Sequence, residues 1–369
     1  MRSAAFLVVL LCLSGCADPE PAGSDRSDWY PLPNSHAHCF RILARGDERQ
    51  LVVFGDAGAK DTLAIYRIGA KADRTLSTKG AVDLTVLDRI AVVSTTHLPY
   101  ISALGRADAV VGAAHLSEVR DTAIVARIAR GRTMEIGTAD GLDRERLLSL
   151  APQALLDYPF GRTGAATGEQ GPARIEVTEY LEQDPLGRAE WIRFFGVLLG
   201  EEARADSLYR AIELRYITVR DMASILPQPP KVFFGSAWQG QWHVPPGNSY
   251  MARLIADAGG LYCYAGQNSD GNIALDLESV LSKARDAGHF GMVLAASGAV
   301  GVMDLAAGDQ RIARLDAVKR GGFYLDSQHS DVFGMALLEP DQLLMDLRCI
   351  FHPRYCGNHR SKYAFAIDQ

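Results

Sequence analysis

The chain has 369 residues, 48% hydrophobic and 22% charged, which is the composition of a globular protein rather than a disordered or fibrous one. Its 38 basic and 44 acidic residues give a net charge of −6, so there is no broad cationic surface for nucleic acid. After the first residues, no apolar run reaches the roughly 18 residues that a membrane-spanning helix needs. The length favours two domains over one.

The N-terminus has the pattern of a targeting segment. Arg2 precedes a short apolar run, which ends in Leu13-Ser14-Gly15-Cys16. This resembles the bacterial lipobox, in which a cysteine is lipidated and becomes N-terminal after cleavage. We therefore predict a signal peptide over 1–15, a lipid anchor on Cys16 and a periplasmic or cell-surface location. Residues 16–35 are rich in Pro, Ser, Asp and Gly and are expected to form a flexible tether. The alternative is an ordinary signal peptide with a chance cysteine.

Beyond the tether, short apolar runs rich in β-branched and aromatic residues alternate with stretches of helical period. The runs are 51–54, 90–93, 109–111, 154–156, 232–234 and 292–294. Helical periodicity marks 117–130 and 249–258 between them. This alternation predicts an α/β fold with mainly parallel sheets. Because ligands bind outside the carboxyl ends of strands in such sheets, the loops after 93 and 234 are the expected site.

One segment, residues 187–226, is helical in pattern almost throughout. Gly200 marks a junction inside it, and the Pro-Gln-Pro-Pro run at 227–230 ends it. At about 1.5 Å per residue, a helix over 201–226 is about 39 Å long. We interpret it as a rigid connector between an N-terminal lobe, 36–186, and a C-terminal lobe, 231–369. A plain packing helix inside one domain is the alternative.

A short repeat links the two halves. The pattern LDxExxLS occurs at 142–149 and again at 275–282, each time shortly before an apolar strand run. The repeat places Glu145 and Glu278 at equivalent points of the two halves. Duplicated lobes around a connector favour a two-lobed binding protein over an enzyme with a single pocket.

Several motifs recur in a recognisable order. They are STTHLPYISALG at 94–105, DPLGRAEW at 184–191, WHVPPGNSY at 242–250, DAGG at 257–260 and the pairs Pro340-Asp341, Asp346-Leu347 and His352-Pro353. Together they resemble the substrate-binding lipoproteins of ABC importers for iron complexes, the group of siderophore, haem and cobalamin binders. The resemblance implies two Rossmann-like lobes with mainly parallel sheets, joined by one long α-helix with little hinge motion. It also implies a monomer with no resident cofactor or metal.

The resemblance assigns further roles. A metallo-cofactor or iron chelate is expected in the cleft between the lobes. Glu145 and Glu278 are expected to dock onto arginines of the permease dimer. Two stretches depart from the usual pattern, Pro245-Pro246-Gly247 and Asp331-Val332-Phe333-Gly334.

Candidate ligand-contacting residues follow the predicted strands in both halves. Aromatic side chains there suit a large, flat or chelate-bearing ligand, although any one of them is equally compatible with a place in the core. The candidates are His97, Tyr100, Trp238, Trp242, Tyr250 and His329.

The remaining cysteines and histidines carry weaker signals. Cys349 and Cys356 flank a turn-like His-Pro-Arg and are the favoured disulfide, with free buried thiols as the alternative. His36 and His38 have no carboxylate nearby in the sequence and are interpreted as surface residues rather than a metal site. No GxSxG, HExxH or P-loop motif is present. Two other functions stay open: an exported α/β enzyme using His97 or His329 with a carboxylate, and a direct metal-ion-binding protein.

Overall fold

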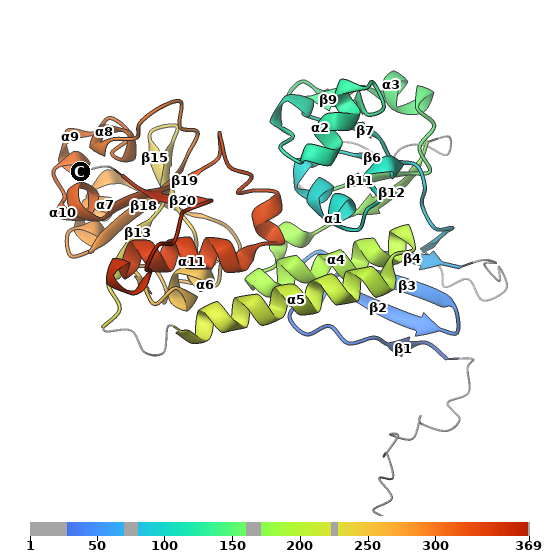
Figure 1. The fold of residues 1–369 in the computed structure, drawn as a ribbon, viewed down its shortest axis with the longest axis horizontal. Coiled ribbons are helices and arrows are strands. Elements are labelled where there is room, and N and C mark those ends of the chain that lie inside the picture. Colours follow the sequence, from blue (N-terminus) through green and yellow to red (C-terminus); the bar gives the residue numbers. More distant parts are fainter. Residues whose placement is uncertain (1–27, 70–79, 160–170, 223–227, 368–369) are drawn as a thin grey trace, which may run out of the picture.

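The computed structural model describes residues 28–69, 80–159, 171–222 and 228–367. Two lobes stand side by side and are joined along one edge by a layer of helices (Figure 1). Cys16 and the expected signal peptide lie outside the described residues. In the described ranges, no helix is long and apolar enough to cross a membrane.

A separate sheet precedes the N-terminal lobe. Its five strands lie in sequence order: β1 (Tyr30–Pro31), β2 (Phe40–Arg45), β3 (Glu48–Phe54), β4 (Thr62–Ile68) and β5 (Ala81–Leu84). All neighbours are antiparallel except β4 and β5. The strand expected at 51–54 is therefore present, but it belongs to this sheet and not to a parallel one. The reason is local: β2 and β3 are joined by a tight turn with Gly46 at φ +58°, which leaves no room for a crossover helix.

The N-terminal lobe proper is a parallel sheet covered by helices. Its strand order is β12-β11-β6-β7-β8, and β7 and β11 are buried along their whole length. The strands are β6 (Ile90–Val92), β7 (Val110–Ala113), β8 (Met134–Glu135), β11 (Ala154–Asp157) and β12 (Ala173–Glu176). The helices are α1 (Leu98–Ala103), α2 (Thr122–Ala129) and α3 (Arg144–Ser149), and β9 (Gly137–Thr138) pairs with β10 (Gly141–Leu142).

The connector consists of two antiparallel helices. α4 (Pro185–Leu199) is buried almost throughout, Gly200 turns the chain with φ +73°, and α5 (Glu202–Asp221) runs back along it. At 20 residues, α5 is about 30 Å long. It continues from the N-terminal sheet to the C-terminal lobe (Figure 1), where the Tyr216 hydroxyl donates to Asp257 at 2.8 Å. The described part of the expected connector helix thus bridges the lobes.

The C-terminal lobe repeats the plan with strand order β16-β13-β18-β19-β20, in which only β20 is antiparallel. These strands are β13 (Lys231–Phe234), β16 (Leu261–Tyr262), β18 (His289–Leu294), β19 (Gly322–Asp326) and β20 (Ala364–Ala366). A small antiparallel sheet joins β14 (Ser236–Trp238), β15 (Gln241–Val244) and β17 (Ile273–Leu275). The helices are α6 (Tyr250–Asp257), α7 (Leu277–Ala284), α8 (Val302–Leu305), α9 (Gln310–Ala313), α10 (Asp316–Gly321) and α11 (Pro340–Phe351).

A disulfide joins Cys349 in the last turn of α11 to Cys356, with Cα atoms 5.4 Å apart. This is the pair that the sequence favours. Among the described cysteines, Cys39 and Cys263 are free.

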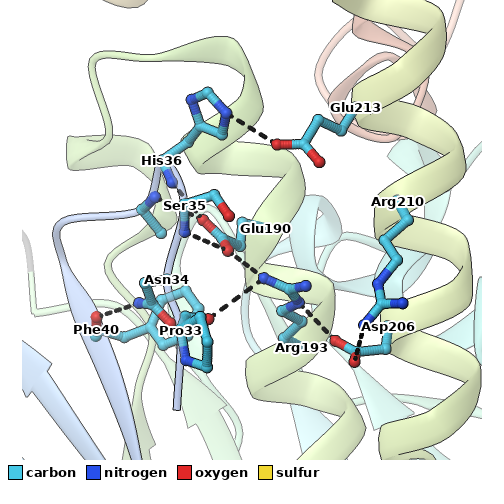
Figure 2. Close-up of polar contacts among 11 residues, drawn as sticks. Pro33, Asn34, Ser35, His36, Phe40, Glu190, Arg193, Asp206, Arg210 and Glu213 are labelled. Carbon is cyan, nitrogen blue, oxygen red and sulfur yellow. Dashed lines mark hydrogen bonds and ion pairs between the residues drawn. The ribbon is translucent and has the colours of Figure 1, made fainter. Parts of the chain in front are cut away.

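Buried carboxylates attach the segment before β2 to α4. Glu190 accepts the backbone N–H groups of Ser35, His36 and Ala37 at 2.7–2.9 Å (Figure 2). Glu182 accepts those of the next two residues, 38 and 39, and the indole N–H of Trp191. Residues 28–35, expected to belong to the tether, are therefore part of the fold.

Candidate functional site

A pocket of about 640 Å³ lies between the two lobes. Two of the segments that line it, 180–183 and 269–272, come after the carboxyl ends of two edge strands, β12 in the N-terminal lobe and β16 in the C-terminal lobe. Three further segments line it: the β3–β4 turn at 55–60, the start of α4 and the start of α6. The loops after 93 and 234, where the sequence analysis expects the site, do not line this pocket.

Arg188 and Tyr250 form the contact between the lobes inside this pocket. The Arg188 guanidinium lies over the Tyr250 ring, with Cζ 4.1 Å from its centroid. Its Nε and Nη2 donate to the carbonyls of Glu182 and Tyr180 at 3.2 and 2.9 Å. Burial raises the pKa of Tyr250 to about 12, and its hydroxyl is buried without a hydrogen-bond partner among the described residues.

Of the six predicted ligand-contacting residues, Tyr250 alone lines this pocket. Tyr100 is fully buried; it stacks on Phe195 with ring centroids 4.9 Å apart, and its hydroxyl donates to the carbonyl of Arg188 at 2.8 Å. The prediction of direct ligand contact is wrong for Tyr100, because its ring packs between helices. Its hydroxyl instead helps to hold the backbone of Arg188 in place through this hydrogen bond.

His97 is also fully buried. Its Nε2 lies 3.5 Å from Oε2 of Glu179, whose Oε1 accepts the hydroxyl of Thr96 at 2.6 Å. Burial raises the pKa of Glu179, but the charge and hydrogen bond of His97, with that of Thr96, outweigh burial and hold it below its ordinary value. His97 therefore faces Glu179 in the interior and does not line the pocket, contrary to the prediction.

The C-terminal candidates occupy different environments. Trp242 is 5% exposed and packs edge-on against Phe233 and Phe290, so it is a core residue. Trp238, on the other strand of the same hairpin, is 63% exposed. His329 is exposed and its Nδ1 lies 3.1 Å from Asp326 at the end of β19. Trp238 and His329 lie outside the pocket and stay predictions.

Sequence reasoning missed several residues that the structure brings to this region. Arg188 lies within the motif at 184–191, and its signal is a charged residue in the first turn of a helix whose other first-turn residues are apolar. Lys60 and Asp56 lie in the turn between β3 and β4. This turn belongs to the antiparallel sheet of β1–β5, which we call the added sheet because it lies before the first of the sequence motifs.

Glu145 and Glu278 occupy matching positions. Each is the second residue of its helix, α3 or α7, and each helix is capped by an aspartate, Asp143 or Asp276, that accepts the N–H three residues on. Both glutamates are exposed. Glu278 lies 3.6 Å from Arg311 across open surface.

His36 does have acidic partners, although they are distant in sequence. Its Nε2 lies 3.1 Å from Glu213 and its Nδ1 3.8 Å from Asp184. The expectation that no carboxylate accompanies it is corrected by the fold, which brings α4 and α5 alongside. Within the described residues, no group of three or more His, Cys, Asp or Glu side chains is placed to hold a metal ion.

Comparison with known proteins finds two sequence relatives that cover most of this chain. Two uncharacterised lipoproteins of Methanocaldococcus jannaschii are 26% and 24% identical to this chain. The matches cover 84% and 90% of this chain, and 76% and 86% of the relatives.

Solved structures share the fold at low sequence identity. A periplasmic haem-binding protein from Pseudomonas aeruginosa is 16% identical with a TM-score of 0.58, covering 77% of this chain and 99% of that one. A protein of an Fe3+-hydroxamate transport system from Saccharomonospora viridis is 17% identical with a TM-score of 0.54, covering 71% and 93%.

The family model described as periplasmic binding protein matches residues 90–328. The match begins at the first residue of β6 and extends past the end of β19. It thus includes the parallel strands of both lobes, the connector helices and the pocket residues of α4 and α6, and leaves out the sheet of β1–β5. Because the family model takes in both lobes and what joins them, this chain belongs to the periplasmic binding protein family.

Proposed function

We propose that this protein captures an iron chelate or a related metallo-cofactor between its lobes and delivers it to an ABC importer. The observation that carries the proposal is the pocket between the lobes, at the carboxyl ends of β12 and β16. Its volume lies within the usual range for small-molecule sites. The haem-binding and Fe3+-hydroxamate proteins of the same fold support this ligand class.

Delivery requires a surface that the importer recognises. Glu145 and Glu278 are exposed, equivalent in their helices and carried by different lobes, so they offer two carboxylates at a fixed separation. Such charges orient a docking protein and raise its association rate. We therefore assign them to the permease dimer, with one glutamate facing each half.

The test pairs uptake with binding. Glu145→Arg combined with Glu278→Arg is expected to abolish uptake in cells, because repulsion replaces attraction. Ligand affinity and stability of the purified variant should stay near wild type, since exposed substitutions shift stability by about 0.5 kcal/mol or less.

The matched control reverses the same charges elsewhere on the two lobes. Glu118→Arg with Asp286→Arg, both at exposed positions, should leave uptake intact. Uptake that persists in the docking variant, or binding that falls with it, contradicts the docking role.

A lipid anchor on Cys16 would keep the protein at the membrane next to its importer. The names of the two lipoprotein relatives support this, and incorporation of a labelled fatty acid tests it. The enzymatic alternative has no comparable support, because His97 is fully buried and His329 lies outside the pocket.

A further inference from the structure

Arg188 has no carboxylate within ion-pair distance among the described residues, in contrast to Arg193 of the same helix. Arg193, in the same helix, pairs with Glu190 and lies 2.8 Å from Asp206 (Figure 2). Arg188 is half-buried, yet its partners are two backbone carbonyls and an aromatic ring. Across the described ranges it makes no ion pair. Its charge helps to lower the pKa of the buried Glu179, but that carboxylate is not in direct contact with it. A half-buried charge without a direct partner is costly, and an anion in the pocket would supply that partner.

The contacts of Arg188 orient the guanidinium without using all of its donors. A guanidinium has five N–H bonds in a planar fork. The Nη1 group has no hydrogen-bond partner among the described residues, and the buried hydroxyl of the neighbouring Tyr250 has none either. The pocket therefore presents the guanidinium of Arg188 to an acceptor group of a ligand, and a carboxylate is the group whose shape matches a guanidinium.

A second cation comes from the added sheet. Lys60 lies in the β3–β4 turn, is exposed and has no ion-pair partner in the described part of the chain. The turn is held by Asp56, whose carboxylate accepts the N–H groups of Gly58, Lys60 and Asp61 at 2.7–3.2 Å. Those bonds, led by the one from Asp61, hold the pKa of Asp56 below its ordinary value. Asp56 is thus engaged by its own turn, and across the pocket Asp270 is the exposed carboxylate of the C-terminal rim.

We propose that the pocket selects a ligand bearing a carboxylate, which binds between Arg188 and Lys60. Selection then depends on a residue outside the matched family region, since Lys60 belongs to β1–β5 and not to the lobes. This inference rests on the proposed function, because it names the chemistry of the ligand that the same pocket takes.

The test uses two iron chelates of opposite charge. Ferric citrate is anionic and carries carboxylates, whereas ferrioxamine B is a hydroxamate chelate with a free ammonium group. Titration calorimetry should give tighter binding for ferric citrate, and its affinity should fall as salt is raised. Arg188→Gln should weaken ferric citrate binding about 10- to 100-fold.

Two surface variants keep the test independent of folding. Lys60→Gln should weaken ferric citrate binding about two- to five-fold, and Asp270→Asn should strengthen it by a similar factor. Lys319→Gln in α10 removes the same charge away from the pocket and should have no effect. Thermal melting of each variant confirms that it is folded.

The outcomes separate this inference from the proposed function. If ferrioxamine B binds as tightly as ferric citrate, and Lys60→Gln and Asp270→Asn change neither affinity, carboxylate selection is wrong while chelate binding stands. If neither chelate binds the folded wild-type protein, the proposed ligand class fails and this inference fails with it.

Discussion

At the scale of single residues, the attachment of the N-terminal segment depends on carboxylates that bind backbone rather than side chains. Five consecutive N–H groups, from residues 35 to 39, are taken up by Glu190 and Glu182. These glutamates are 0% and 1% exposed. Outside regular structure, a buried run of N–H groups needs such acceptors, because unpaired buried donors are costly.

Replacing Glu190 tests this attachment. Glu190→Gln keeps the shape but loses the charge that faces three N–H groups and Arg193. We expect the free energy of unfolding to fall by about 2–4 kcal/mol, measured by urea denaturation. Glu118→Gln, at an exposed position, is the matched control and should change it by about 0.5 kcal/mol or less. A loss no larger than in the control would contradict the role of Glu190.

His36 gives the attachment a pH dependence. The Asp184 carboxylate, followed by that of Glu213, raises the pKa of His36 above 6.5 against burial. Burial raises the pKa of Asp184, but His36 and the N–H of Leu186 outweigh it and hold that pKa below its ordinary value. A raised histidine pKa stabilises the fold fully below the unfolded value and ceases to do so as pH rises through the folded value.

The expected measurement is a stability difference at two pH values. His36→Asn should be less stable than wild type by about 1 kcal/mol near pH 6, and the difference should vanish by about pH 9. His38→Asn, which alters the exposed neighbour, should show no such trend. A difference that is the same at both pH values would mean that His36 acts by packing alone.

The direction in which individual side chains face was harder to predict than the strands that these residues follow. Tyr100 and Trp242 follow or border strands as expected, but α1 and β15 turn their rings into the core. Sequence position determines which strand end a residue follows, whereas packing against distant helices determines which way it faces. The sequence does not indicate Arg188 for the same reason, because Arg188 becomes part of a pocket only where α6 packs against α4.

At the scale of elements, periodicity located helices and strands better than it located their partners. The helix expected at 249–258 is α6, Tyr250–Asp257. The strand at 51–54 is real, yet its partners are the antiparallel neighbours β2 and β4. A short apolar run looks the same in either kind of sheet, so the distinction comes from connections and not from the run itself.

The disulfide is the element-scale feature most open to a direct test. It closes a short loop from the end of α11 to Cys356 and restricts the unfolded chain. Cys349→Ser with Cys356→Ser should lower the free energy of unfolding by about 2 kcal/mol. Reductant should lower the melting temperature of the wild type and leave that of the double variant unchanged. Equal responses to reductant would contradict a stabilising disulfide.

At the scale of the whole molecule, α5 connects three bodies. Near its start Arg49 of β3 lies 2.7 Å from Glu202, and near its end Arg215 lies 3.2 Å from Asp341 of α11. One continuous helix thus contacts the added sheet, α4 and the C-terminal lobe. Large hinge motion would have to break these contacts together.

We therefore expect ligand binding to change the overall dimensions little. Small-angle scattering with and without saturating ferric citrate should give radii of gyration within about 1 Å of each other. Tyr216→Phe, which removes the hydrogen bond to Asp257, is a useful comparison because it loosens one end of the bridge. A contraction of several Å in the wild type would contradict the rigid connection.

The β3–β4 turn has a consequence for how such a protein could diversify. Among the described residues, Asp56 accepts hydrogen bonds from N–H groups of its own turn alone, so these bonds hold the loop without a contribution from the lobes. A loop that is held by internal hydrogen bonds can be replaced as a unit between β3 and β4, and the replacement would present new side chains to the same pocket. Variants of these few residues would change the ligand preference of the pocket while the rest of the protein stays the same. The turn is therefore the natural starting point for a library of variants with new ligand specificities.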